Sequence, residues 1–211
     1  MKISRLHLFL AAVIGIGILS ALMHATFPLL SDKMKWFWLT YSDIVSKEGA
    51  AHTAGIPYLN YQIEYPVLTG LFIRLMGILG RSEWQYYALT CDYLILFAVL
   101  ATYFLYHTVK ADKSKRLLNY WVLAPSMFVF LIYNWDIMAV LCMVVALYFT
   151  LRDRDCFASV ALAFGFSCKL YPALYLVPLL MKYRSATDWA KIIGTFGATA
   201  LAINLFFMVS N

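Results

Sequence analysis

Six polar side chains in this apolar chain have the chemical types that a reaction at a membrane surface needs. They are Asp43, His52, Glu64, Asn134, Asp136 and Lys169. A carboxylate beside a bilayer can act as a general base on a hydroxyl group. A lysine at the same level can hold a phosphate as a compact point charge. Such a set would bring water-soluble chemistry to a substrate whose tail stays in lipid.

Each of these residues also has a structural interpretation. Asp43 can be a solvated acid in an interfacial loop, and Asn134 and Asp136 can cap a hairpin turn and the helix that follows it. His52 alone is a weak signal. Lys169 is harder to explain in this way, because a lysine at mid-bilayer costs at least about 2.5–3.5 kcal/mol unless it is paired or reaches a polar cavity.

The composition places these residues in an integral membrane protein. The chain is 63% apolar and only 13% charged, with a mean hydropathy of +0.74, whereas soluble domains carry about 25% charged residues. Apolar stretches long enough to cross a bilayer recur, and the chain has room for about six or seven spans. We therefore expect an all-α, polytopic bundle of transmembrane helices that forms a single domain over residues 1–211.

The net charge of +6 does not indicate a nucleic-acid partner, because the positive residues sit in short clusters between apolar segments, as in cytoplasmic loops. The four cysteines form no CxxC pair or Cys/His cluster. The pattern therefore predicts neither a disulfide framework nor a metal site.

Five segments are expected to be spans, at about 6–30, 84–107, 117–133, 137–151 and 190–209. Residues 66–80 are apolar but too short to cross at about 1.5 Å per residue. With the polar and aromatic stretch 31–65 they form an expected extracytoplasmic loop, 31–80, that carries juxtamembrane helices. Residues 157–181 fit either one tilted span or two half-helices broken near Lys169 and Pro172, and we favour the broken hairpin.

The positive-inside rule gives a topology. Lys2 and Arg5 place the N-terminus in the cytoplasm, so the 31–80 loop lies outside. If 66–80 does not cross, the basic loop 110–116 returns to the cytoplasm. All six polar residues then lie on the extracytoplasmic side of a plasma or ER-type membrane.

Four short motifs, in this order, resemble those of GT-C glycosyltransferases. They are Tyr41-Ser-Asp43, Gly55-Ile-Pro57-Tyr58 with Glu64-Tyr65-Pro66, Asn134-Trp-Asp136, and Lys169-Leu-Tyr171-Pro172. The chain is most similar to the branch that uses polyprenyl-phosphate sugars, which includes GPI mannosyltransferase I and bacterial and archaeal polyprenol-dependent mannosyl- and arabinosyltransferases. One departure is Val67, which stands where that branch has a second proline.

The resemblance implies an inverting transfer of a mannose-like sugar from a polyprenyl-phosphate donor, without a nucleotide sugar, cofactor or metal. Asp43 falls on the position of the catalytic base. The residues implied for donor or acceptor binding are Glu64, Lys169, Tyr171, Asn134, Asp136 and His52.

Three classes of function stay open on the sequence. The chain can be an enzyme or the core half of one, since members of that branch are commonly much longer and a second membrane protein could supply further spans. It can be a non-catalytic GT-C-like subunit that binds lipid or partner proteins. It can also be a transporter, because a broken helix with an intramembrane lysine suits a substrate path.

Overall fold

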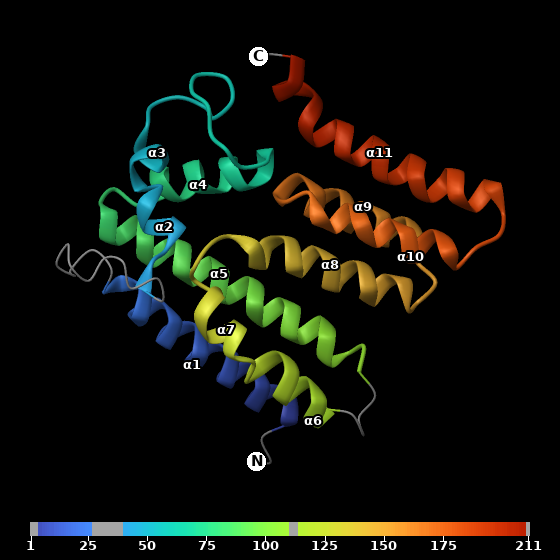
Figure 1. The fold of residues 1–211 in the computed structure, drawn as a ribbon, viewed down its shortest axis with the longest axis horizontal. Coiled ribbons are helices and arrows are strands. Elements are labelled where there is room, and N and C mark those ends of the chain that lie inside the picture. The colour runs from blue at the N-terminus through green and yellow to red at the C-terminus, as the bar shows by residue number, and fades with distance from the viewer. Residues whose placement is uncertain (1–3, 27–39, 110–113, 210–211) are drawn as a thin grey trace. The chain divides into compact units, whose positions relative to one another are not determined.

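The computed structural model describes residues 4–26, 40–109 and 114–209. These residues form helices joined by turns and contain no strand (Figure 1), which confirms the all-α fold. Three of the described helices are long and apolar enough to cross a membrane: Arg5–Ala25 (α1), Glu83–Tyr106 (α5) and Ala186–Val209 (α11). The shorter apolar helical segments are Val67–Leu79 (α4), Asp136–Thr150 (α8), Asp155–Cys168 (α9), and Tyr171–Met181, which joins a 3-10 turn to α10.

Most predicted boundaries agree with the structure. Helix α5 matches the span expected at 84–107, and α4 confirms that 66–80 is a short helix of 13 residues. The juxtamembrane helices are present as Asp43–Ser46 (α2) and Glu48–His52 (α3). Helix α1 ends at Ala25, and positions 27–30 of the first predicted span lie outside the described residues, as do positions 110–113 of the basic loop.

The segment predicted as one span over 117–133 is not one continuous helix. A short helix, Ser114–Leu117 (α6), continues as a π-helical turn, Leu118–Val122, and a new helix, Pro125–Phe130 (α7), follows. The interruption lies at Ala124, whose backbone is extended directly before Pro125. Proline lacks an N–H and disfavours helical geometry in the residue before it, so the helix restarts with Pro125 as its first residue.

The broken interpretation of 157–181 is confirmed. Helix α9 ends at Cys168, a 3-10 turn covers Tyr171–Tyr175, and Leu176–Met181 (α10) completes the segment. Lys169 is the residue after α9, and its extended backbone (φ −159°, ψ 147°) ends the helix. The Lys169–Pro172 motif therefore lies at the break between two half-helices.

The chain divides into two compact units. The first unit comprises Met1–His52 and Leu75–Ile137, and the second comprises Thr53–Arg74 and Met138–Asn211. In the first unit, α1 packs along α5 (Figure 1). Gly17 permits this approach, because a Cβ there would lie 2.6 Å from the Ile95 side chain. The Tyr87 hydroxyl donates to the Ala21 carbonyl at 2.6 Å and joins the same two helices.

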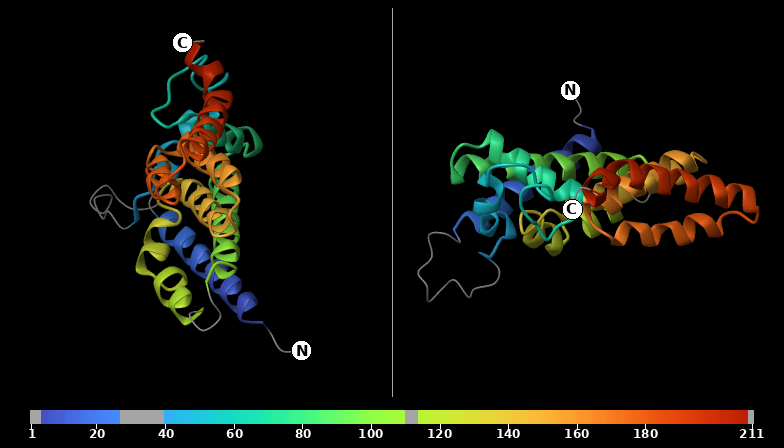
Figure 2. Two further views of the ribbon diagram at one scale, coloured as in Figure 1. Left: turned by 90° about the vertical axis from the view of Figure 1, so that its right-hand side faces the viewer. Right: turned by 90° about the horizontal axis from the view of Figure 1, so that it is seen from above.

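In the second unit, α9 packs along α11 (Figure 2). The amide of Asn204 on α11 donates to the Ser167 hydroxyl of α9 at 2.8 Å. Its core is a cluster of buried apolar side chains from α8, α9, α10 and α11: Ala146, Ala158, Leu162, Leu179 and Ile192. In a bilayer, close van der Waals packing of such side chains and hydrogen bonds such as that of Asn204 hold helices together.

Candidate functional site

In the first unit, the backbone around Asp43 is tied to the turn that precedes α8. The N–H of Asp43 donates to the carbonyl of Tyr133 at 2.8 Å. The Ser42 hydroxyl donates to the carbonyl of Ile132 at 2.8 Å and also caps α2 by accepting from the Ile44 N–H. Asp43 itself is half-buried. The start of α2 is therefore held beside the Asn134 motif, although the two are about ninety positions apart.

The Asn134 side chain caps the start of α8. Its side-chain oxygen accepts the N–H of Asp136 at 2.9 Å, which is the hydrogen bond that a residue before a helix makes to an otherwise unpaired N–H. Asp136 begins α8. The capping interpretation of Asn134 is thereby confirmed, while a role of either residue in ligand binding stays a prediction.

His52 fixes α3 against the turn between α4 and α5. Its Nδ1 lies 2.6 Å from the Glu48 carboxylate and its Nε2 lies 2.8 Å from the Gly80 carbonyl. Both ring nitrogens therefore face acceptors, which suits the doubly protonated ring. The hydrogen bond to Gly80 raises the pKa of His52 above its usual value, Glu48 acts in the same direction, and burial opposes them.

Gly77 allows α3 to approach α4 this closely, because a Cβ at that position would lie 2.1 Å from the Ala51 carbonyl oxygen.

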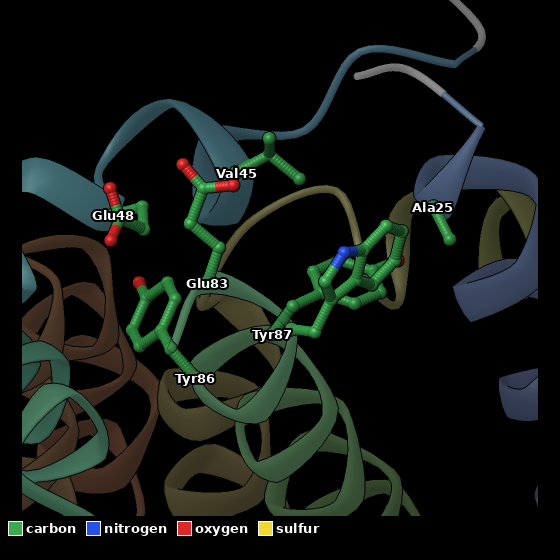
Figure 3. A pocket seen from close by; sticks show the side chains of 7 residues that line it. Ala25, Val45, Glu48, Glu83, Tyr86 and Tyr87 are labelled. Atoms are coloured by element: carbon green, nitrogen blue, oxygen red, sulfur yellow. The ribbon is translucent and has the colours of Figure 1, made fainter. Parts of the chain in front are cut away.

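A pocket of about 120 Å³ lies beside α2 and α3 (Figure 3). Glu48 lines it from α3, and the first turns of α5 supply Glu83, Trp84, Tyr86 and Tyr87. The Tyr86 side chain is 1% exposed. The pocket thus combines carboxylates, aromatic rings and a buried phenol.

In the second unit, the Gly55–Pro66 segment folds on itself. Gly55 and Tyr58 have positive φ angles of 101° and 69°. The Tyr58 hydroxyl donates to the carbonyls of Tyr65 and Pro66 at 2.7 and 2.9 Å, and burial raises the pKa of this hydroxyl. The Arg74 Nε donates to the Gly55 carbonyl at 2.9 Å. These motif residues shape the loop, which leaves Glu64 exposed.

The second unit also connects this loop to the helix break. Thr69, near the start of α4, donates through its hydroxyl to the carbonyl of Cys168 at 2.8 Å. Cys168 directly precedes Lys169, which is half-buried, as is Tyr171 at the start of the 3-10 turn. The segment that follows Glu64 is thus docked on the residue before Lys169.

The predicted site residues therefore fall into two sets. Asp43, His52, Asn134 and Asp136 belong to the first unit, and Glu64, Lys169 and Tyr171 belong to the second. Within each unit the structure brings motifs from distant parts of the sequence together. A single site that uses both sets stays a prediction.

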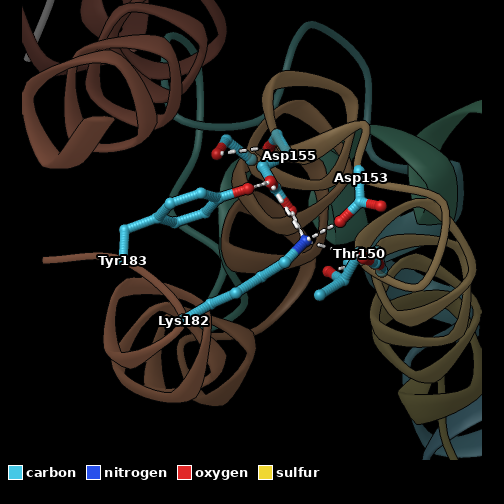
Figure 4. Close-up of polar contacts among 7 residues, drawn as sticks. Thr150, Asp153, Asp155, Lys182 and Tyr183 are labelled. Atoms are coloured by element: carbon cyan, nitrogen blue, oxygen red, sulfur yellow. Dashed lines mark hydrogen bonds and ion pairs between the residues drawn. The ribbon is translucent and has the colours of Figure 1, made fainter. Parts of the chain in front are cut away.

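Sequence reasoning missed a charged cluster in the second unit (Figure 4). The Lys182 ammonium lies 2.7 Å from the Asp153 carboxylate and 3.3 Å from the Asp155 carboxylate. It also donates to the Thr150 carbonyl, and the Tyr183 hydroxyl donates to Asp155. Burial lowers the pKa of Lys182, but the contacts with these acids and with Tyr183 outweigh it and the pKa is raised.

This cluster joins the turn after α8 to the turn after α10. Both turns therefore lie at the same end of the second unit, as the broken hairpin requires. The sequence contains acids at positions 153 and 155 and a lysine at position 182. Their separation along the chain does not show that these side chains form ion pairs.

No group of three or more His, Cys, Asp or Glu side chains in residues 4–26, 40–109 and 114–209 is arranged to hold a metal ion.

The three helices that are long and apolar enough to cross a membrane indicate an integral membrane protein. The family model for glycosyltransferase family 87 matches residues 63–210, which is more than half of the chain. The chain belongs to this family, which is a GT-C-type family of membrane glycosyltransferases. Searches of curated proteins and of solved structures gave no match.

The family assignment confirms the GT-C resemblance. Glu64, Asn134, Asp136, Lys169 and Tyr171 lie within the matched residues, whereas Asp43 and His52 precede them.

Proposed function

We propose that the chain transfers a mannose-like sugar from a polyprenyl-phosphate donor to an acceptor on the extracytoplasmic side, with Asp43 as the catalytic base. The observation that carries this proposal is the position of Asp43. It begins α2, is fixed beside the Asn134 turn through the Tyr133 carbonyl, and belongs to the same short helix as Val45, which lines the pocket of Figure 3.

In the proposed reaction, the Asp43 carboxylate takes the proton of the acceptor hydroxyl. The hydroxyl oxygen attacks the anomeric carbon of the donor sugar from the face opposite the phosphate. The bond between that carbon and the phosphate oxygen breaks, and polyprenyl phosphate leaves with the bonding electrons. Inversion at the anomeric carbon follows from this single displacement.

Lys169 is proposed to hold the donor phosphate, and its place at a helix break supports this role. An unwound segment inside an apolar region is tolerated where it is buried in protein or lines a polar cavity. Glu64 and Tyr171, from the same unit, are proposed to contact the donor or the acceptor. The reaction needs no cofactor beyond the lipid-linked donor, and membrane lipids surround the apolar helices. In this scheme a second membrane protein supplies further spans.

A donor assay tests the proposed function. The purified chain in lipid nanodiscs should transfer radiolabelled mannose from polyprenyl-phosphate mannose to a glycan acceptor, and should not transfer it from GDP-mannose. Transfer from GDP-mannose alone would contradict the lipid donor. Binding of the lipid donor without transfer is the behaviour of the alternative, a non-catalytic subunit of the same fold.

The proposed topology has its own measurement. Ser46 and Lys115 are both exposed, and the positive-inside rule places them on opposite sides of the membrane. In a background without the four native cysteines, a membrane-impermeant thiol reagent should label Ser46→Cys but not Lys115→Cys in intact cells. Labelling of both variants from outside would contradict the topology.

A further inference from the structure

We propose that Asp92 on α5 is the contact point for a transmembrane helix of a second membrane protein, and that this helix carries a lysine or an arginine at the same depth. The inference rests on the proposed function in one respect, because it names the docking surface and the chemistry of the partner that supplies further spans. It does not depend on which sugar is transferred or on which residue acts as the base.

Asp92 lies deep in a helix that is apolar enough to cross the membrane. Helix α5 has 24 residues, and Asp92 lies about 14 Å along its axis from Glu83, at about 1.5 Å per residue. The hydrocarbon core of a bilayer is about 30 Å thick, so this position is well inside it. An acid at such a depth is rare and costly unless it faces the protein interior, a water-filled cavity or a partner group.

The described part of the chain supplies no partner for this acid. Within residues 4–26, 40–109 and 114–209, the Asp92 carboxylate makes neither a hydrogen bond nor an ion pair, and the side chain is exposed. Gln85, Ala88 and Leu96 follow one another at helical spacing on the same face of α5 and are exposed as well. The acid therefore lies in the middle of an unpacked face of a membrane-spanning helix.

Two grooves meet at Asp92. One, of about 520 Å³, runs along α5 from Arg81 to Asp92. The other, of about 210 Å³, lies between α1 and α5, and Asp92 and Ala88 line it too. Ala21 and Ala25 line it from α1, and small residues let the backbones of packed membrane helices approach closely. The groove between α1 and α5 therefore admits a third helix beside the carboxylate.

The charge of Asp92 indicates the nature of the partner. A lysine or arginine on a neighbouring helix would pair with the carboxylate and compensate both charges inside the membrane. A second copy that presents the same face supplies no such cation, because α1 and α5 contain no lysine and their single arginine, Arg5, is the first residue of α1. Two copies would instead bring two Asp92 carboxylates together, which is unfavourable for like charges.

A lipid fits this face less well than a cationic helix does. The amine of a phosphatidylethanolamine headgroup stays at the bilayer surface. The side chain of Asp92 is too short to reach it from this depth, whereas longer lysine and arginine side chains do reach the interface. A hydrocarbon or polyprenyl chain in the grooves offers no group that pairs with the carboxylate. A cationic helix matches both the grooves and the charge.

The first test uses synthetic transmembrane helices as probes. A leucine-rich helix of about 20 residues with one central lysine should associate with the full chain in phosphatidylcholine nanodiscs, as measured by fluorescence energy transfer. Asp92→Asn keeps the size of the side chain and should weaken this association by about 5- to 30-fold, the range of polar contacts between model membrane helices. The same probe with leucine in place of lysine should associate equally with both proteins. The variant should fold, because it removes a charge that is costly in the membrane.

Glu83→Gln is the matched control, since it removes an acid from the first turn of the same helix, and it should bind the lysine probe as the wild type does. Reversal of the charge gives a second, independent result. Asp92→Lys should lose the lysine probe and bind a probe with a central aspartate. Equal association of the lysine probe with the wild type, Asp92→Asn and Asp92→Lys would overturn the proposal.

Two further outcomes would overturn the proposal and assign the face to another occupant. Self-association of the chain that is lost in Asp92→Asn, measured by single-molecule photobleaching in liposomes, would assign it to a second copy. Enrichment of phosphatidylethanolamine around the protein that depends on Asp92, with no such dependence for the lysine probe, would assign it to a lipid amine.

The probe measurement contains neither donor nor acceptor, so it separates this inference from the proposed function. If the lysine probe associates through Asp92 but the chain transfers no mannose from the lipid donor, the proposed function fails and the docking surface stands. If transfer occurs and association of the probe does not depend on Asp92, only the docking surface fails.

Discussion

Replacement of Asp43 by asparagine should lower the rate of sugar transfer by about 10²-fold or more, because a positioned general base contributes about 10²–10⁴-fold to such reactions. Asparagine keeps the size of the side chain and can still form hydrogen bonds, but it does not take a proton. The backbone bond from position 43 to the Tyr133 carbonyl and the Ser42 cap of α2 do not involve the carboxylate. The variant should therefore fold and bind the donor normally.

The measurement is the initial rate of transfer from polyprenyl-phosphate mannose, with donor binding determined separately on the same preparation. Asp188→Asn is the matched control, since Asp188 lies in the other unit, in the first turn of α11, and pairs with Lys191. A wild-type rate in correctly folded Asp43→Asn would remove Asp43 from the mechanism. It would direct attention to the acids within the family match, such as Glu64 and Asp136.

The sequence predicted those helices best whose ends carry local signals. Helix α5 begins after Ser82, which caps it by accepting from the Gln85 N–H, and its apolar run then continues without interruption. The break after α9 was predicted because a lysine and a proline lie three residues apart in an apolar segment. The break at Ala124 was not predicted. The residues on both sides of Pro125 are apolar, and no charged residue lies next to this proline to mark an interruption of the span.

The sequence supplied candidate residues for the site but not the contacts that these residues make. The types and order of the motif residues suggested Asp43, Asn134 and Lys169, and hydropathy placed Asp43 in a loop, Asn134 at a hairpin turn and Lys169 inside an apolar segment. Contacts such as that between Ser42 and Ile132 join residues 90 positions apart, and no local pattern specifies them. The pocket was missed for the same reason. Glu48 and His52 have helical i, i+4 spacing, but only the fold brings them to Tyr86.

Lys169→Met is expected to weaken binding of the polyprenyl-phosphate donor by about 10- to 100-fold. This range corresponds to the roughly 1.5–3 kcal/mol that a hydrogen bond to a charged group contributes. Lys169 ends α9 with an extended backbone whose N–H donates to the Gly165 carbonyl at 2.8 Å, and methionine can keep this bond. Its half-buried side chain lies where the loop after Glu64 is docked through Thr69.

Expression of Lys169→Met should remain near the wild-type level, because the substitution removes a charge that is costly to place in an apolar region. Lys191→Met, on the exposed side of α11, is the control, since it removes the same charge outside the proposed site and should leave donor binding unchanged. The decisive comparison is between polyprenyl-phosphate mannose and polyprenol, which lacks the phosphate. If Lys169 holds the phosphate, the variant should lose affinity for the phosphorylated lipid alone. Equal loss for both lipids would instead mean that Lys169 supports the shape of the helix break, and unchanged binding of both would exclude it from the donor site.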